Sequence, residues 1–380
     1  MSKRYDLIVV TGEPFPYGMA ASNRLLCYAS SIAESKRVLV LTYDAPYRDG
    51  AQEFGTVNGV DYRYMHQPRT APAKKVVRLM FLLHRYMKIL ILLLFRYRYK
   101  SVVFVSRKLL YAAAIKCVAR VRGAKLYREI SESPEYIKSK YKRKIALYMY
   151  RMFDGFIAIS SDIENTLKHS ARKSKYYLLP VLVQVDRFDK CGAVAKRDVV
   201  FYCSGGNAER DGLLDTLKGF IKYRETNDTD IKLEIATVLY NNNHYHEDVK
   251  EIIEKYPNYF SYLGCLPTTE IPRKLMESRI LMLTPHKNYV TRGFPTKLGE
   301  YFASGTPVIC SSIQDLVEHI PSDIVYFVEP NSTDDICKAL SMLLSDRSGS
   351  KALGENARRW VEQHYTMDRY RDGLIQFLGL

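Results

Sequence analysis

The sequence lacks several patterns that mark particular classes of protein. Its seven cysteines are scattered, and no two of them form a Cys-x-x-Cys pair. This spacing argues against a zinc ribbon and a disulfide framework, and it is typical of a chain in a reducing compartment. The apolar run at 7–10 is too short for the core of a signal peptide. We therefore expect a cytoplasmic protein whose first element is a buried strand.

Metal-binding patterns are also missing. The eight histidines form no His-Glu-x-x-His motif, and His244 and His246 lie in a polar stretch. Asp228-Thr229-Asp230 matches the Asp-x-Asp motif of metal-dependent sugar transferases, but it falls in a polar turn before an expected strand. We predict that the protein binds no metal.

Acidic residues are scarce in the first half of the chain. Residues 1–190 contain 35 lysines and arginines against 15 acidic residues, whereas the remainder contains 22 against 26. No acidic residue occurs between Asp61 and Glu129. Such a charge favours an anionic partner: nucleic acid, anionic lipid or a phosphorylated substrate. No recognised nucleic-acid-binding motif accompanies it, so we expect no nucleic-acid partner.

The 380 residues, 47% of them hydrophobic, are enough for two domains. Short apolar runs bounded by turn residues alternate with helical patterns in both halves of the chain. This alternation predicts an α/β fold with two Rossmann-like domains, each built on a parallel sheet, joined near 180–195. The expected strands are 7–10, 38–41, 102–105, 124–127 and 156–159, then 199–202, 232–236, 280–283 and 308–310.

The segment 74–98 has an unusual helical pattern. Five basic residues fall on one narrow stripe of a helix, and almost every other position is apolar; they are Lys74, Arg78, Arg85, Lys88 and Arg96. The charges inside the segment argue against a transmembrane span. A helix that packs on a sheet needs a narrower apolar arc than this one. The surplus surface predicts contact with another helix, a partner or an anionic membrane surface, and the basic clusters at 138–144 and 172–175 suit the membrane.

Two loops of the first half are candidate ligand sites. The loop 11–22 follows the first strand and ends at a helix start, where doubly wound domains bind ligands. Tyr17, Gly18 and Met19 lie in it, and it contains no Gly-x-Gly-x-x-Gly. The segment 128–135 follows the strand 124–127. Glu129 or Glu132 could orient or deprotonate an acceptor hydroxyl there, or the segment is a helix cap.

Two segments of the second half suit a diphosphate. The loop 204–212 carries Gly205, Gly206 and Arg210, which leave room for phosphates and supply a cation, although it is not a Walker A loop. In 292–309, a glycine-containing loop opens a helix near Thr296. Lys297 and Glu300 lie three residues apart on one side of that helix, where the lysine suits a diphosphate and the carboxylate can hold ribose hydroxyls.

Taken in order, these segments resemble the GT-B glycosyltransferases of the family-4 (group 1) type. The segment 293–309 is similar to the donor-binding segment of that family. Further similarity lies at 157–160, at Pro180 with 185–188, in Arg210-Asp211-Gly212 and at 354–358. The resemblance covers nearly the whole chain, weakly at 43–99 and strongly at 280–310.

The resemblance implies two Rossmann-like domains facing across a cleft: an acceptor domain over 1–185, a nucleotide-sugar domain over 186–364, and a last helix, 365–380, returning to the first domain. It implies retaining, metal-independent transfer of a hexose-type sugar, with fixed cations stabilising the leaving diphosphate. The nucleotide sugar, UDP- or GDP-linked, is a co-substrate, and no cofactor is implied. The donor-binding residues implied are Gly205, Gly206, Gly293, Phe294, Pro295, Thr296, Leu298 and Glu300, the catalytic ones Arg210, Lys297, Glu129 and Glu132, and the cleft loop Tyr17, Gly18 and Met19.

The chain departs from the family pattern at two places. Arg292 stands where the first glutamate of the E-x7-E motif would be, which leaves the sugar open. Glu129, Ser131 and Glu132 occupy the region where many relatives carry a histidine.

The favoured function is transfer to a lipid-linked saccharide, in surface polysaccharide or glycolipid biosynthesis, by a peripheral protein on the inner face of the cell membrane. The alternatives are a nucleotide-sugar epimerase, a catalytically degenerate scaffold and a basic nucleic-acid-binding protein, and the oligomeric state is left open.

Overall fold

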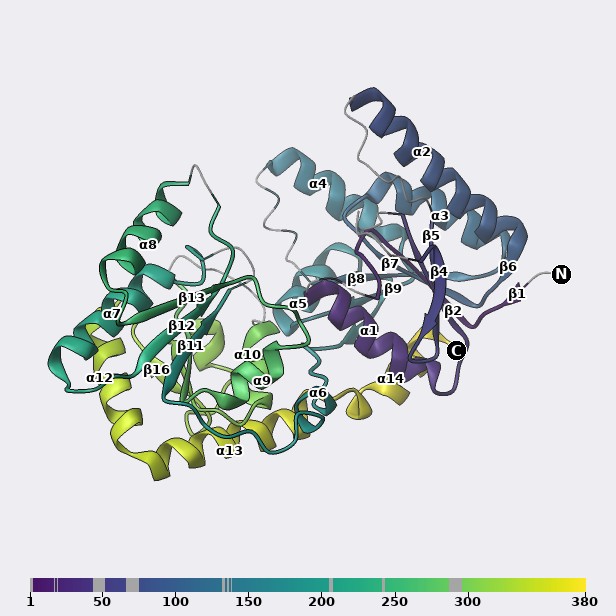
Figure 1. The fold of residues 1–380 in the computed structure, drawn as a ribbon. Helices are drawn as coiled ribbons and strands as arrows, with labels where there is room; N and C mark the ends of the chain where they lie inside the picture. Colours follow the sequence, from purple (N-terminus) through teal and green to yellow (C-terminus); the bar gives the residue numbers. More distant parts are fainter. Residues whose placement is uncertain are drawn as a thin grey trace. The chain divides into compact units, whose positions relative to one another are not determined.

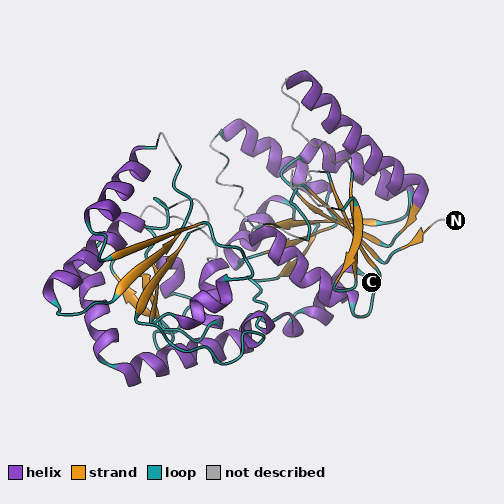
Figure 2. Cartoon of the chain, viewed as in Figure 1, coloured by secondary structure: helices purple, strands orange, loops and turns teal. Residues whose placement is uncertain are grey.

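The computed structural model describes residues 3–16, 18, 20–43, 52–65, 75–131, 134, 137, 139–204, 208–240, 243–286 and 296–380. The chain divides into two compact units. The N-terminal unit comprises Met1–Leu182 and Met367–Leu380, and the C-terminal unit comprises Val183–Thr366. The sequence placed the boundaries at 185 and 364, within three residues of these positions. In each unit, helices lie on both sides of a sheet (Figures 1 and 2).

The N-terminal unit is built on an eight-stranded sheet in the order β10-β9-β8-β7-β2-β3-β5-β4. All neighbours in it are parallel except β4 and β5, which form an antiparallel hairpin. The central strands are buried apolar runs, as expected for a parallel sheet covered on both faces. The strands are β2 (Leu7–Thr11), β3 (Val38–Thr42), β4 (Phe54–Val57), β5 (Val60–Tyr64), β7 (Ser101–Val105), β8 (Lys125–Ile130), β9 (Gly155–Ala158) and β10 (Lys175–Leu178).

The C-terminal helix belongs to the N-terminal unit. Helix α14 (Arg371–Leu378) packs against α1 (Ala20–Ala33) and β10. Its last carbonyls are hydrogen-bonded by side chains from the sheet: the Tyr127 hydroxyl donates to Phe377 O at 3.0 Å, and the Ser101 hydroxyl donates to Leu378 O at 2.6 Å. These bonds satisfy carbonyls that a helix end leaves without partners. The remaining helices of the unit are α2 (Lys75–Ile91), α3 (Leu109–Val121), α4 (Lys140–Met149) and α5 (Ser161–Ser170).

Helix α2 turns Arg85 and Lys88 of its basic stripe inward, whereas Arg78 is exposed and the apolar face points outward. The Arg85 side chain is buried, and its Nη1 donates to Tyr43 O at 2.6 Å. Lys88 Nζ donates to Met65 O at 3.0 Å. The opposite face is exposed, at Val76, Leu79, Met80, Leu83, Met87 and Ile91. The helix 74–98 expected from the sequence is therefore shorter: α2 ends at Ile91, a π-helical turn follows at Leu92–Arg96, and the chain enters the short strand β6 (Tyr97–Arg98), which pairs with β1 (Lys3–Arg4).

The C-terminal unit has a six-stranded parallel sheet in the order β13-β12-β11-β14-β15-β16. One face packs on α7 (Leu213–Thr226), α8 (His244–Lys255) and α12 (Thr333–Ser345). The other packs on α9 (Ile271–Glu277), α10 (Thr296–Ala303) and α13 (Arg347–His364). The strands are β11 (Val199–Cys203), β12 (Lys232–Ala236), β13 (Phe260–Gly264), β14 (Ile280–Leu283), β15 (Val308–Ser311) and β16 (Tyr326–Val328); the short helices are α6 (Asp186–Asp189) and α11 (Gln314–Val317).

The predicted α/β class with parallel sheets is confirmed, and every strand expected from an apolar run is present, with bounds that differ by at most three residues. Strands β4, β5, β10, β13 and β16 were not expected. Partly exposed residues interrupt their apolar pattern; four of them lie at sheet edges, and β5 lies next to an edge. Among the described residues, none of the helices combines the length and the apolar character needed to cross a bilayer.

Candidate functional site

A buried carboxylate organises the carboxyl end of the C-terminal sheet. Asp211, on the loop between β11 and α7, is 3% exposed. Its Oδ2 accepts a hydrogen bond from the Ser204 hydroxyl at 2.9 Å and forms an ion pair with Lys297 Nζ. Its Oδ1 lies 3.4 Å from Arg210 Nε. One buried anion thus holds two cations at the strand end where an α/β domain binds its ligand.

Lys297 and Arg210 reach this carboxylate from two elements that lie far apart in the sequence. Lys297 is the second residue of α10, so it stands at a helix N-terminus, where the helix dipole also favours an anion. Arg210 lies on the loop after β11, and its side chain is half exposed. Together they place net positive charge at the mouth of the sheet, an arrangement that suits a phosphate or diphosphate group.

The loop that carries Asp211 is fixed by close backbone packing. Gly212 has a φ of +74°, and a Cβ on it would lie 1.7 Å from Thr284 O. The carbonyl of Gly212 accepts from the Thr216 hydroxyl at 3.1 Å and from the Thr284 hydroxyl at 3.2 Å. Only glycine fits there, since any side chain would collide with the strand-end backbone. This contact sets the position of Arg210 and Asp211.

The second carboxylate of the segment, Glu300, lies one turn after Lys297 on α10. Its Oε1 accepts from Arg187 Nη1 at 2.6 Å, and Arg187 Nη2 donates to Thr268 O at 2.7 Å. Both side chains of the pair remain partly exposed. Glu300 is thus held in place by an arginine from α6 while part of its surface stays accessible to a ligand.

Two residues next to these side chains belong to the core instead. Leu298 is fully buried in the apolar cluster between the sheet and α13, so its side chain does not face a ligand. The Tyr301 hydroxyl accepts from Cys203 N at 3.1 Å and donates to Cys203 O at 3.3 Å. Burial raises the pKa of the Cys203 thiol to about 11, which keeps it protonated. Cys203 is therefore unsuited to act as a nucleophile.

The structure brings Arg210, Lys297 and Ser204, the first residue of the loop 204–212, together around Asp211. Gly205, Gly206, Arg292, Gly293, Phe294, Pro295, Tyr17, Met19 and Glu132 lie outside the described residues, and so does the side chain of Thr296. Gly18 is described, and a Cβ on it would lie 2.1 Å from the Ser22 hydroxyl oxygen at the start of α1. Gly18 thus permits the tight turn before that helix.

Glu129 takes part in a buried ion pair of the N-terminal unit. Arg24 Nε donates to its Oε1 at 2.6 Å, and the Tyr28 hydroxyl donates to its Oε2 at 2.8 Å. Arg24 also donates to Pro180 O and, at 2.6 Å, to Leu179 O. Both oxygens of Glu129 are therefore occupied within the protein, and the pair fastens the segment after β10 to the sheet. This arrangement suits a positioning role more than that of a base.

Arg128 is the second notable charge at the end of β8. Its side chain is 6% exposed and stacks on Tyr150, with its guanidinium carbon 4.6 Å from the ring centroid. Within the described part of the chain, its Nε and Nη1 have no hydrogen-bond partner. Burial lowers the pKa of Arg128, and the nearby Arg107 lowers it further, although contact with Tyr150 opposes this. A buried guanidinium with unused donors favours an anion.

Two residues considered as metal ligands have other roles. His246 is buried, and its Nδ1 accepts from Tyr240 N at 2.9 Å; His244 is exposed and lies 3.2 Å from Glu247. Over the described ranges, no group of three or more His, Cys, Asp or Glu side chains is placed to hold a metal ion.

The sequence analysis did not single out Asp211, Arg187 or Arg24 for a role. Each is identified by its partner: Lys297, Glu300 and Glu129 lie 86, 113 and 105 residues away. Two of these residues lie in segments that carried the family resemblance, Asp211 in Arg210-Asp211-Gly212 and Arg187 in 185–188, but neither segment shows which residue they contact.

Residues 196–346 match a family model described as glycosyl transferases group 1. The matched segment lies within the C-terminal unit. It contains Asp211, Arg210, Lys297 and Glu300. The search of curated protein sequences found no match.

The glycosyltransferase fold extends over the whole chain. The structure is similar to sucrose-phosphate synthase from Thermosynechococcus elongatus, with a TM-score of 0.71, 14% identity and 98% coverage of both chains. It is equally similar to Anabaena HepE solved in complex with UDP, with a TM-score of 0.71, 12% identity and 98% and 99% coverage of this chain and that one. The structure is also similar to a glycosyltransferase from Rickettsia africae, with a TM-score of 0.69 and 15% sequence identity. That likeness covers 98% of this chain and 97% of the other. These likenesses confirm the predicted GT-B fold class.

Replacing Gly212 by alanine should destabilise the C-terminal unit because the new Cβ would overlap Thr284 O. Gly264→Ala is the matched control: Gly264 has a φ of +67° but nothing within 4 Å of its Cβ position. We expect Gly264→Ala to cost about 1–2 kcal/mol of the free energy of unfolding, and Gly212→Ala about 1–3 kcal/mol more. Urea unfolding followed by circular dichroism measures both. Equal costs would contradict the packing argument.

Glu129→Gln should destabilise the N-terminal unit by about 3–5 kcal/mol because it leaves Arg24 buried without its counter-charge. The double variant Arg24→Met/Glu129→Leu should recover a large part of that loss. The midpoint of urea unfolding measures both effects. A Glu129→Gln variant that unfolds like the wild type but has no activity would instead identify Glu129 as a base.

Proposed function

We propose that the protein transfers a sugar from a nucleotide-sugar donor to an acceptor hydroxyl, with the donor bound by the C-terminal unit. The observation that carries this proposal is the pair of cations, Lys297 and Arg210, held by the buried Asp211 at the carboxyl end of the sheet. It lies within the segment that matches the group 1 glycosyl transferases. HepE has been solved with UDP and with UDP-glucose, which supports a UDP-sugar as the donor, with a GDP-sugar as the alternative.

In the proposed reaction, the bond between the anomeric carbon and the diphosphate oxygen breaks, and its electron pair stays on the diphosphate. A new bond joins the anomeric carbon to the acceptor oxygen, and the proton of the acceptor hydroxyl passes to the departing diphosphate oxygen. Lys297 and Arg210 would offset the charge that develops on the diphosphate, which is how fixed cations lower such a barrier without a metal. Glu300, held by Arg187, would accept hydrogen bonds from the donor ribose.

Retention of configuration is proposed on the resemblance to the group 1 enzymes, and the anomeric signal of the product in a proton NMR spectrum tests it.

The N-terminal unit is proposed to bind the acceptor. Glu129 would act there as a positioning residue, since Arg24 and Tyr28 occupy its oxygens. The unused donors of Arg128 would suit an anionic group of the acceptor, such as the phosphate of a lipid-linked saccharide. Glu132 and the loop around Gly18 remain candidates for contact with the acceptor.

We propose that the acceptor is lipid-linked and that the protein binds the inner face of the cell membrane through the N-terminal unit. Helices α2, α3 and α4 expose large apolar side chains, and α4 adds a basic groove without a carboxylate. The apolar side chains include Leu79, Met80, Leu83 and Met87 on α2, Leu110 and Val121 on α3, and Tyr141 and Tyr148 on α4. The groove is lined by Lys140, Arg143, Lys144, Arg151 and His169. Apolar residues beside basic ones are typical of a surface that enters an anionic bilayer interface. We accordingly propose a role in surface polysaccharide or glycolipid biosynthesis.

A screen of nucleotide sugars by thermal shift should identify the donor, and Lys297→Ala should then lower the transfer rate about 100-fold or more because one of the two cations is lost. Lys222→Ala is the matched control: Lys222 pairs with Asp334 on the surface of the same unit, so its loss should leave the rate unchanged. Circular dichroism checks that both variants fold. A Lys297→Ala variant with the wild-type rate would contradict the proposed donor site.

The triple variant Met80→Gln/Leu83→Gln/Met87→Gln should weaken binding to vesicles of phosphatidylglycerol and phosphatidylcholine because it removes apolar surface from the exposed face of α2. Stability should not fall, since these side chains are about half exposed or more. Met342→Gln, at an exposed apolar position of the C-terminal unit, serves as the control. Co-sedimentation measures the bound fraction. Unchanged binding by the triple variant would overturn this role of α2, as would self-association of the wild type through that face.

A further inference from the structure

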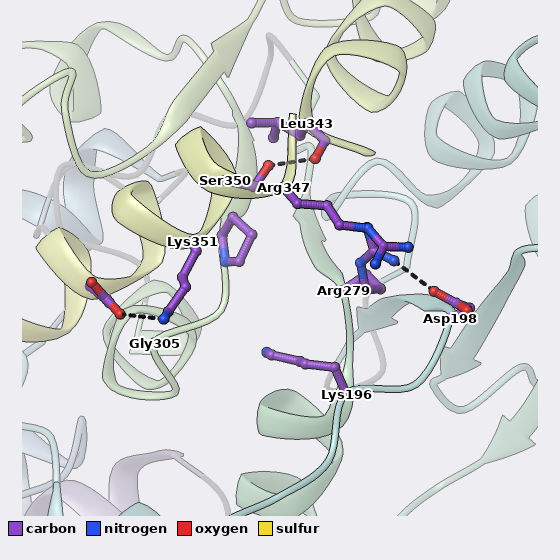
Figure 3. A pocket seen from close by; sticks show the side chains of 10 residues that line it. Lys196, Asp198, Arg279, Gly305, Leu343, Arg347, Ser350 and Lys351 are labelled. Atoms are coloured by element: carbon purple, nitrogen blue, oxygen red, sulfur yellow. Dashed lines mark hydrogen bonds and ion pairs between the residues drawn. The ribbon is translucent and has the colours of Figure 1, made fainter. Parts of the chain in front are cut away.

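A cavity of about 500 Å³ lies at the end of the C-terminal sheet opposite the candidate donor site (Figure 3). Four of the residues that line the cavity come just before strands. Lys196 and Asp198 precede β11, Arg279 precedes β14, and Pro307 precedes β15. In a parallel sheet these amino ends share one edge, and Asp211 and Lys297 lie at the other. The start of α13 closes the cavity with Arg347, Ser350, Lys351 and Glu355.

The charges around this cavity do not cancel. Four of the lining residues are cations and two are carboxylates. Asp198 is paired with Arg279, with Oδ1 and Nη1 2.6 Å apart, and Glu355 lies 3.6 Å from Lys351. Both pairs are drawn in Figure 3. Lys196 and Arg347 are left without a carboxylate partner among the residues that line the cavity, so it carries an excess of two positive charges.

Lys196 is held in a way that leaves its charge uncompensated. Its ammonium donates to Ser278 O at 2.8 Å and to the Thr306 hydroxyl at 2.7 Å, both of which are neutral oxygens. Burial lowers the pKa of Lys196 to about 8, and the neighbouring Arg279 contributes to this shift. A cation that the protein destabilises in this way gains from an anion placed beside it.

The wall formed by α13 is rigid. A Cβ on Gly354 would lie 2.2 Å from Gly305 O, so the helix packs directly on the turn before β15. The Ser350 hydroxyl donates to Leu343 O, which ties the first turn of α13 to α12. The carboxylate of Asp346 caps α13 by accepting from Gly349 N at 2.9 Å, so it is engaged by its own helix. Arg347 therefore projects from a fixed first turn.

We propose that this cavity is a second ligand site, which binds the phosphate monoester of a small soluble molecule between Lys196, Arg279 and Arg347. A phosphate monoester carries close to two negative charges at neutral pH and therefore matches the excess of two positive charges. The cavity volume lies in the range of pockets that hold small organic ligands. The site involves none of the residues assigned to the donor, so it stands or falls independently of the proposed transferase reaction.

Calorimetric titration of the full chain tests this site with three probes at physiological salt: glucose 6-phosphate, inorganic phosphate and glucose. We expect saturable binding of glucose 6-phosphate, weaker binding of inorganic phosphate and none of glucose. Arg347→Gln and Lys196→Gln should each weaken binding about tenfold or more, because each removes a charge-assisted hydrogen bond to the phosphate. Arg359→Gln is the matched control: it removes the same charge from the same helix, but Arg359 does not line the cavity and contacts Asn356.

Four results would overturn the proposal. One is the absence of saturable heat with either phosphate probe from protein that is folded by circular dichroism. Another is binding that Arg347→Gln and Lys196→Gln leave intact and Lys297→Ala abolishes, which would place the phosphate in the donor site. The third is an equal loss with Arg359→Gln, which would indicate non-specific attraction to a basic surface. Tighter binding of inorganic phosphate than of glucose 6-phosphate would show a free phosphate site and not a phosphate-monoester site.

Discussion

The carboxylate of Asp211 is the interaction on which the candidate donor site depends. It is buried, and it faces Ser204, Lys297 and Arg210 at once. A buried carboxylate is tolerated only where hydrogen bonds and counter-charges satisfy it. Its presence therefore fixes where the lysine of α10 and the arginine of the β11 loop lie, and the close contact of Gly212 with Thr284 fixes the carboxylate in turn. In the proposed reaction the cations would be in place before a diphosphate arrives, so little reorganisation would be needed.

The N-terminal unit also contains a buried carboxylate paired with a cation, but this pair stabilises the fold. The ion pair of Arg24 and Glu129 is also buried at the carboxyl end of a parallel sheet, but its remaining donors go to the carbonyls of Leu179 and Pro180. The pair therefore fastens the chain where it leaves the unit. Arg128 points to the other face of the same strand and has unused donors. Adjacent residues of one strand thus point to opposite faces of the sheet, one in an ion pair and the other with unused donors, as the alternation of side chains along a strand allows.

Much of the fold could be predicted from the sequence, because a parallel strand that is buried on both faces appears as a short apolar run. The hairpin β4–β5 and strands such as β13 and β16 could not, since their residues are only partly buried and their order in the sheet is set by packing. The same limit applies to the site. Lys297 and Glu300 could be named from the helix that carries them, whereas Asp211 and Arg187 acquire their roles from partners 86 and 113 residues away. The basic stripe of 74–98 was visible, but the sequence could not show that Arg85 and Lys88 turn inward to bind backbone carbonyls.

Net charge and local charge give different information about the two halves of the chain. The first half is strongly basic, and its exposed apolar side chains on α2 lie on the same unit as a groove lined by no carboxylate; the proposed contact with an anionic bilayer rests on this combination. The second half is slightly acidic, and a global count would assign it no affinity for anions. Its two candidate anion sites arise because there are fewer carboxylates than cations at each of them. Lys297 and Arg210 share one aspartate, and Lys196 and Arg347 have no carboxylate partner among the residues that line their cavity. Interactions between exposed charges are screened over about 8–10 Å in physiological salt. The affinity of each site for an anion therefore depends on the charges that line it, and not on the net charge of the whole unit.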